Sequence, residues 1–137
     1  MNPPNNKRLP SSPKEWLAHA ISDLKFARLG KENQDILNQQ ICFHAQQAAE
    51  KAFKAILLFH KVDFPLTHDI EELMDICGKV GISLPPDFSD TGILTPYAVE
   101  TRYPGYWEEI TEGEVEEAIK LAEEVVDWAK EYISRRR

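Results

Sequence analysis

One run in the last third of the chain could bind a nucleotide or RNA. In the six residues RYPGYW, Arg102 can pair with a phosphate, and Tyr103, Tyr106 and Trp107 offer rings on which bases can stack. The Pro-Gly pair inside the run is typical of a chain turn. The structural alternative is that the rings seal one end of the fold while Arg102 pairs with Glu100 or another carboxylate. Both interpretations remain open at this point.

A second candidate is a polar stripe. His44, Gln47 and Lys51 recur at steps of three and four residues, so a helix would place them on one face. Such a face could present hydrogen-bond donors to a nucleotide or a phosphate. The plain alternative is an ordinary solvated face or the seam of a dimer, because polar stripes are common on amphipathic helices.

The third candidate is His68, which lies between Thr67 and Asp69 at the start of a predicted helix. Metal-free RNA cleavage needs a group that takes the 2′-hydroxyl proton and a cation that stabilises the charge developing on the phosphate. His68 is a candidate for the first role and Arg102 for the second, although the two are far apart in the sequence. The plain role of His68 is to complete a helix cap or to bond a loop carbonyl, and we favour it.

The elements that must position these residues are helices. A capping serine, a proline at the first helical position and a glutamate three residues after the serine mark a helix start at Ser12, and apolar residues at helical spacing continue it to Gly30. The capping pattern returns at Thr111, followed by an apolar face that runs to Ile133. These patterns predict the first and last helices of the fold.

The second predicted helix runs from about Asp35 to His60 and would form the spine of the fold. One of its faces is apolar and rich in alanine, which would let a neighbouring helix come close: Ile41, Ala45, Ala48, Ala52, Ala55 and Phe59. Thr67 is expected to cap a third helix. A fourth helix is expected from about Ile93 to Thr101, with Pro96 in its first turn or at a kink.

Because no stretch shows strand alternation, these elements predict an all-α fold, an antiparallel bundle of four or five helices. We expect a single domain over residues 12–134. Residues 1–11 should form a disordered N-terminal tail and residues 135–137 a basic C-terminal tail.

Composition limits the classes of function. A formal charge of −7 over 137 residues argues against avid, sequence-independent nucleic-acid binding, while a local basic site is compatible with it. The longest apolar run covers residues 55–59, far short of the roughly 20 needed to cross a bilayer, and the N-terminus has no apolar signal core. We therefore expect a cytoplasmic protein. Cys42 and Cys77 have neither metal-ligand nor redox spacing, so we expect reduced, partly buried thiols, no metal site and no cofactor.

Three marks in this sequence resemble the HEPN domain family. The segment HAQQAAEKAFKA, residues 44–55, resembles the family's second helix, and Thr67-His68-Asp69-Ile70 resembles the start of its third. Tyr97 followed by Arg102-Tyr103-Pro104 is similar to the ending of its fourth helix. The marks occur in the family's order, and the resemblance spans about residues 14–133.

The resemblance implies an all-helical homodimer that is often paired with a minimal nucleotidyltransferase, and in several branches a toxin whose partner is the antidote. Some branches are metal-independent ribonucleases that resemble one another in an arginine followed four to six residues later by histidine. Neither Arg102 nor Arg28 has a histidine at that spacing here. This departure favours a noncatalytic partner protein. If the chain is an enzyme, the resemblance implies an RNA endonuclease that uses Arg102 with a noncontiguous histidine.

The function we expect is a dimeric nucleotide-binding or partner subunit of a nucleotidyltransferase, in a toxin–antitoxin-like or nucleotide-transfer system, with a nucleotide or RNA as ligand. The wide alanine-rich surface of the second helix exceeds what a small bundle obviously needs, which also favours a homodimer. The candidate binding residues line the polar stripe or match the family's marks: His44, Gln47, Lys51, His68, Asp69, Tyr97, Arg102 and Tyr103.

Overall fold

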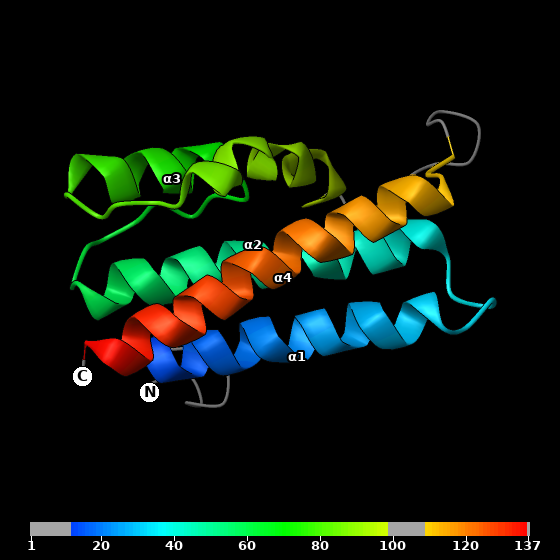
Figure 1. Cartoon of the computed structure of the whole chain (residues 1–137), viewed down its shortest axis with the longest axis horizontal. Coiled ribbons are helices and arrows are strands. Elements are labelled where there is room, and N and C mark those ends of the chain that lie inside the picture. The colour runs from blue at the N-terminus through cyan, green and yellow to red at the C-terminus, as the bar shows by residue number, and fades with distance from the viewer. Residues whose placement is uncertain (1–11, 99–108, 137) are drawn as a thin grey trace, which may run out of the picture.

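The computed structural model describes residues 12–98 and 109–136, and every regular element within them is a helix. The elements are α1 (Pro13–Lys31), α2 (Asn38–Phe59), α3 (Ile70–Lys79), the 3₁₀ helix η2 (Pro86–Ala98) and α4 (Glu112–Arg135). Figure 1 shows α1, α2 and α4 as three long neighbouring rods, with α3 and η2 lying along one side of them. The predicted all-α bundle is confirmed.

The caps that begin the first and last helices are those that the sequence predicts. The Ser12 side chain accepts a hydrogen bond from the backbone N–H of Glu15 at the start of α1. At the start of α4, the Thr111 hydroxyl accepts from the N–H of Glu114, and the Glu114 carboxylate accepts from the N–H of Thr111. These bonds satisfy backbone donors that have no partner within the helix.

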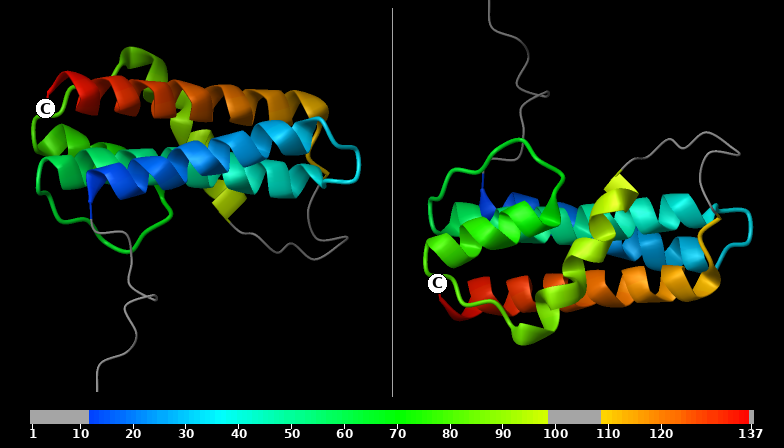
Figure 2. Two further views of the ribbon diagram at one scale, coloured as in Figure 1. Left: turned by 90° about the horizontal axis from the view of Figure 1, so that it is seen from below. Right: turned by 90° about the horizontal axis from the view of Figure 1, so that it is seen from above.

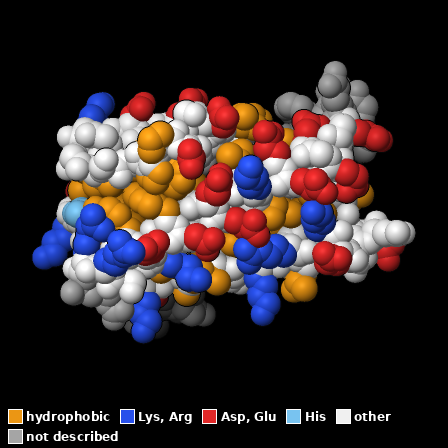
Figure 3. Space-filling view, viewed as in Figure 1, with side chains coloured by type: hydrophobic (Ala, Val, Ile, Leu, Met, Phe, Trp, Pro, Cys, Tyr) orange, Lys and Arg blue, Asp and Glu red, His pale blue; other side chains and the backbone are white. Residues whose placement is uncertain are grey.

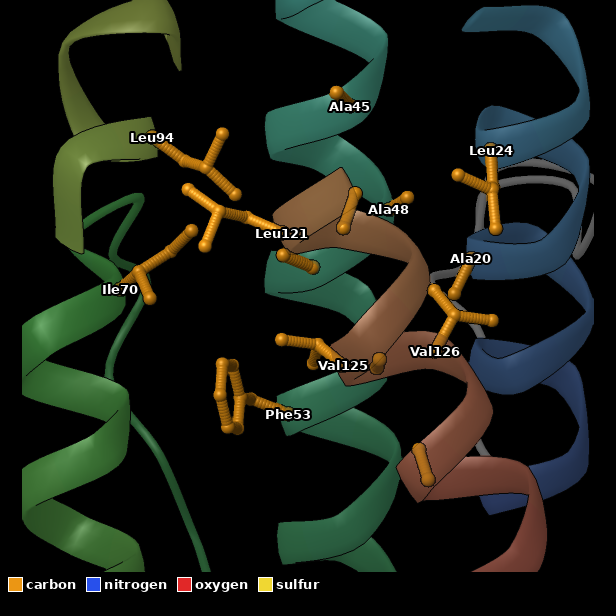
Figure 4. Close-up of a cluster of buried hydrophobic side chains, with 14 of the residues drawn as sticks. Ala20, Leu24, Ala45, Ala48, Phe53, Ile70, Leu94, Leu121, Val125 and Val126 are labelled. Carbon is orange, nitrogen blue, oxygen red and sulfur yellow. The ribbon is translucent and has the colours of Figure 1, made fainter. Parts of the chain in front are cut away.

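Helix α2 occupies the centre of the bundle. It contacts α1, α4, α3 and η2, and thirteen of its 22 residues are buried. Figure 2 shows it between α1 and the layer of α3 and η2. In the close-up of Figure 4, Ala20 and Leu24 of α1 lie on one side of α2, and Ile70 and Leu94 lie on the other, with side chains of α4 between them.

The alanine-rich surface of α2 is covered within the chain itself. Ala45, Ala48, Ala52 and Ala55 are all fully buried. Small side chains on α2 let neighbouring helices approach closely, so the stripe serves intramolecular packing. The expectation that this surface exceeds the needs of the bundle was therefore wrong, and it gives no reason for a dimer.

Two helix starts differ from the sequence prediction. Helix α2 begins at Asn38 and not near Asp35, because the N–H of Asp35 donates to the Asn33 side chain in a turn before the helix. The cap of α3 is Asp69, whose carboxylate accepts from the N–H groups two and three residues further along the chain. Thr67 acts one step earlier, where its hydroxyl accepts from the N–H of Asp69.

The fourth helix is earlier in the chain than predicted and is of another type. It starts at Pro86, the second residue of a proline pair, and it includes Pro96. Its buried residues Phe88, Thr91 and Leu94 are spaced by three, which is the repeat of a 3₁₀ helix. A search for α-helical spacing misses this pattern. Residues 99–101, the predicted end of this helix, lie outside the described part.

Both thiols are fully buried, and they form no disulfide. Burial raises the pKa of Cys77 to about 11, so its thiolate is scarce at neutral pH. The predicted N-terminal tail lies outside the described residues. Arg135 still belongs to α4 and pairs with Glu131, one turn earlier. In the described segments, no helix is long and apolar enough to span a membrane.

Candidate functional site

A buried carboxylate on α2 holds one exposed histidine in place. The Glu50 side chain is 3% exposed, and its Oε1 lies 2.9 Å from Nδ1 of His68 in the loop between α2 and α3. Gln46 is fully buried one turn earlier, and its Nε2 donates to Glu50 Oε1 at 3.0 Å and to the His68 carbonyl at 3.1 Å. Both the ring and the backbone of His68 are therefore clamped to α2.

The charge of Glu50 is balanced by a lysine on the same helix. Lys54 Nζ donates to Glu50 Oε2 at 2.8 Å, and its side chain is 7% exposed. The ammonium also lies 5.5 Å from the centre of the Trp16 ring and 5.7 Å from that of Phe64. A buried charge is tolerated when it is paired in this way, and rings facing a cation add to its stability.

These contacts determine which nitrogen of His68 carries the proton. Burial raises the pKa of Glu50, but the hydrogen bonds from Lys54, Gln46 and His68 and the charge of Lys54 together bring the pKa below its ordinary value of 4.5. Glu50 is therefore ionised at neutral pH and can only accept, so Nδ1 of His68 must be the donor. The Nε2 atom of the neutral ring then carries a lone pair.

The imidazole of His68 is open to a ligand, since its side chain is 68% exposed. Among the residues that the structure describes, none forms a hydrogen bond with its Nε2. An exposed nitrogen with a lone pair, backed by an ionised carboxylate on the other nitrogen, can accept a hydrogen bond or take a proton. The predicted helix-cap role is wrong in detail, because Asp69 is the cap and His68 binds Glu50.

A second histidine is held in a similar way on the other flank of α2. Asp23 of α1 lies between two α2 residues, with Oδ1 3.0 Å from Nδ1 of His44 and Oδ2 2.7 Å from Nζ of Lys51. All three side chains are between 15% and 23% exposed. The polar stripe is thus a half-buried contact with α1 and not an open, solvated face.

Two phenylalanines flank the ring of His44. The ring of Phe26, on α1, lies 4.1 Å from that of His44 between centroids, with the planes tilted by 41°. The ring of Phe43 meets it edge-on at 5.2 Å. Phe26 is 46% exposed, so one aromatic face next to this polar contact remains accessible.

Gln47 of the polar stripe contacts the clamp around His68. Its Nε2 donates to Gln46 Oε1 at 2.7 Å and lies 3.4 Å from Glu50 Oε1. Gln47 therefore supports the residues that hold His68, whereas His44 and Lys51 of the same stripe bind Asp23.

The end of η2 lies beside the start of α3. The backbone N–H of Ile70 donates to the Thr95 hydroxyl at 3.1 Å. Tyr97 follows two residues later and is partly buried. His68, Asp69 and the last turn of η2 thus meet at one end of α3. Arg102 and Tyr103 lie outside the described residues, so their positions relative to His68 stay predictions.

Several residues of this site were missed at the level of sequence. The polar line Gln46, Glu50 and Lys54 has a spacing of four along α2 and is separate from the stripe of His44, Gln47 and Lys51, and that spacing was a usable signal. Asp23 and Phe26 gave no such signal, because their importance depends on how α1 packs against α2. Within residues 12–98 and 109–136 no group of three potential ligands could hold a metal ion.

The opposite flank of α1 has a different character. It forms a groove with α4 of about 380 Å³, lined by Leu24, Leu29 and Val126 and by charged side chains. Figure 3 shows acidic and basic side chains interspersed over this face. One of its ion pairs joins Arg28 to Glu123 at 2.5 Å.

Two of the comparisons with known proteins name the same family. A model of the HEPN domain matches residues 13–132. A crystal structure of ST0689, an archaeal HEPN homologue, is 28% identical with a TM-score of 0.68, and the match covers 89% of this chain and 98% of that one. A crystal structure of TT1696 from Thermus thermophilus is also 28% identical, with a TM-score of 0.75 and the same coverage. Among proteins with curated descriptions, none matches the chain.

Proposed function

Because this chain belongs to the HEPN family, we propose that it is a dimeric nucleotide-binding partner subunit of a minimal nucleotidyltransferase. It would work in a toxin–antitoxin-like or nucleotide-transfer system in the cytoplasm. The observation that carries the binding part of this proposal is the clamp around His68. Buried Glu50 binds the exposed imidazole through Nδ1, Gln46 binds the carbonyl of His68, and Lys54 pairs with Glu50, so that Nε2 is left unused by the described residues.

A purely structural role explains this arrangement less well. Burying Glu50 and Lys54 involves a desolvation penalty that well-packed apolar residues of similar volume would avoid. A loop can be attached to a helix without charged groups. What the charges add is a fixed tautomer and a fixed ring orientation, and these matter when a ligand meets the outer nitrogen.

Binding is tested with the purified full chain. We expect calorimetric titration with ribonucleoside triphosphates and a short single-stranded oligoribonucleotide to show saturable binding. His68→Ala should weaken it by about two- to tenfold, the effect of one lost hydrogen bond. His19→Ala is the matched control, because His19 is an exposed histidine of α1 outside this site. Equal affinities of the two variants would contradict a role for His68.

The partner and the dimer are inferred from the family resemblance and have separate tests. Co-expression with a minimal nucleotidyltransferase from the same genome should give one co-eluting complex, and independent elution would contradict the partnership. Sedimentation of the chain alone at tens of micromolar should show a homodimer with a twofold interface. A strictly monomeric species at that concentration would contradict the dimer.

A metal-independent ribonuclease is the second candidate function, and the Glu50–His68 contact favours it. A carboxylate that orients a histidine, with the outer nitrogen free to take a proton, is the base half of metal-free RNA cleavage. Arg102 would supply the cation. It follows Ala98 by four residues, a chain length of at most about 14 Å, and Ala98 ends the helix that bonds to the start of α3.

The two functions are separated by incubating total cellular RNA with the parent, Arg102→Ala and His68→Ala in the presence of a chelator. The partner-subunit function predicts intact RNA in all three reactions. Cleavage by the parent that disappears in both variants would establish the ribonuclease in its place.

A further inference from the structure

The surface beside His44 has an accessible aromatic ring in a polar setting. Phe26 is 46% exposed although it lies in the middle of α1, and one side of its ring packs at 4.1 Å on the His44 imidazole. Phe43 holds the imidazole from another side at 5.2 Å. The result is a small aromatic surface formed jointly by α1 and α2.

This surface is held firmly. Asp23 binds the His44 ring through Nδ1 at 3.0 Å and binds Lys51 at 2.7 Å, so α1 and α2 are joined directly beneath it. Asp23 precedes Phe26 by three residues and therefore lies on a neighbouring part of the same helix face. A stacking ring that is already ordered loses little conformational entropy when a ligand binds.

The groups around the ring suit a nucleobase better than a protein partner. The Lys51 ammonium binds the same Asp23 carboxylate as the His44 ring, which places it within about 8 Å of the ring nitrogen, and Gln47 lies one helical turn from His44 along α2. A nucleotide needs one π-face, a few polar contacts and a cation at about this separation. The centre of a protein interface needs a wider apolar area and fewer charges.

We propose that Phe26 and His44 form a stacking platform for a base of the nucleotide or RNA, with the sugar–phosphate running along α2 towards Lys51. Lys51 has three N–H donors and uses one on Asp23, so it can also pair with a phosphate. The platform rests on the proposed nucleotide-binding function. The proposal assigns contact with the base to Phe26, a residue that the sequence did not indicate.

The experiment is a titration of AMP and of a single-stranded oligoadenylate into the full chain and three variants. Phe26→Leu keeps an apolar side chain and removes the π-face, and it should weaken binding about tenfold, since stacking on an aromatic ring provides a factor of this order per base. Phe26→Tyr keeps the ring and should stay within about threefold of the parent. Ribose 5-phosphate, which has no base, should bind the parent and Phe26→Leu equally.

The control variant is Ile21→Ala, which removes a 39% exposed apolar side chain from the groove between α1 and α4 and should leave every affinity unchanged. Oligoadenylate binding by the parent that survives in Phe26→Leu would overturn the platform and leave the proposed function standing. No binding of either probe by the parent would overturn both. Loss of a dimer in Phe26→Leu with unchanged affinity for the probes would show a subunit seam in place of the platform.

Discussion

Replacing Glu50 with glutamine would remove the negative charge on which the clamp around His68 depends. The two side chains have nearly the same shape, so the substitution changes charge with little change in packing. The Lys54 ammonium would then stay buried without its carboxylate, near two aromatic rings that compensate only part of the loss. The variant therefore measures what an unpaired charge does at the centre of this bundle.

The expected magnitude follows from that geometry. Removing one partner of a buried ion pair costs about 3–5 kcal/mol, and rings close to the remaining cation recover about 1 kcal/mol. We expect Glu50→Gln to lower the free energy of unfolding by about 3 kcal/mol. The whole free energy of unfolding of a domain is about 5–15 kcal/mol, so the variant should still fold at 25 °C, with a urea midpoint lower by about 1.5–2 M.

Urea unfolding followed by far-ultraviolet circular dichroism is the assay. Glu117→Gln, an exposed position on α4, is the control and should change stability by less than about 0.5 kcal/mol. Replacing Glu50 and Lys54 together by methionine removes both charges and should return stability to within about 1 kcal/mol of the parent. Equal midpoints for Glu50→Gln and the parent would refute the idea that this pair is desolvated.

The same pair has a signature in pH. The pKa of Glu50 is lower in the folded chain than its ordinary value of 4.5, so the unfolded chain takes up the proton first as the pH falls. The contribution of Glu50 to stability is complete above about pH 4.5 and is lost as the pH falls through the lower, folded value. The difference in stability between parent and Glu50→Gln should therefore shrink in acid. A stability difference that stays constant down to low pH would contradict a lowered pKa of Glu50 in the folded chain.

Three further predictions address packing and binding. Ala52→Leu adds bulk at a fully buried position and should lower the free energy of unfolding by about 1–3 kcal/mol. Lys51→Ala loses one partly exposed ion pair and should lower it by less than about 1 kcal/mol. Equal melting temperatures of the two variants would show that the helix faces are wrongly assigned. Among the residues that the structure describes, none forms a hydrogen bond with the buried hydroxyl of Thr91. Thr91→Val should therefore raise the urea midpoint by an amount equivalent to about 1 kcal/mol, and a fall would point to an unseen partner. Arg102→Ala should weaken binding of the nucleotide or the partner enzyme by about 1.5–3 kcal/mol in calorimetry. Arg102→Lys should restore only part of that binding free energy, and full affinity of this variant would argue against a bidentate arginine contact.

The parts of the fold that sequence predicts well are those governed by local chemistry. The caps at Ser12 and Thr111 are formed by residues within one turn of each other, so their pattern is complete in a short stretch. The alanine face of α2 is likewise a matter of helical spacing. By contrast, the 3₁₀ helix was missed because its buried residues Phe88, Thr91 and Leu94 follow a repeat of three and include a polar one.

The site was predictable only in part, because the two residues of each contact lie on different elements of the fold. The sequence predicts His68 and His44 as site residues, and in the structure their rings bind carboxylates on other parts of the chain. The partners Glu50 and Asp23 are 18 and 21 residues away, and a sequence gives no rule for pairing across that separation. The pairing depends on the packing of α1 and of the α2–α3 loop against α2.

The central position of α2 also restricts how this protein can diverge over evolutionary time. The helix that carries Gln46, Glu50 and Lys54 is the one that every other described helix packs against, so a substitution in it alters folding together with the proposed ligand site. Variation in specificity is less constrained where the residues lie on the flanks, at Phe26 on α1 and at His68 in the loop. Relatives with different ligands should therefore differ first at these flanking positions, and retain the polar line of α2 that supports them.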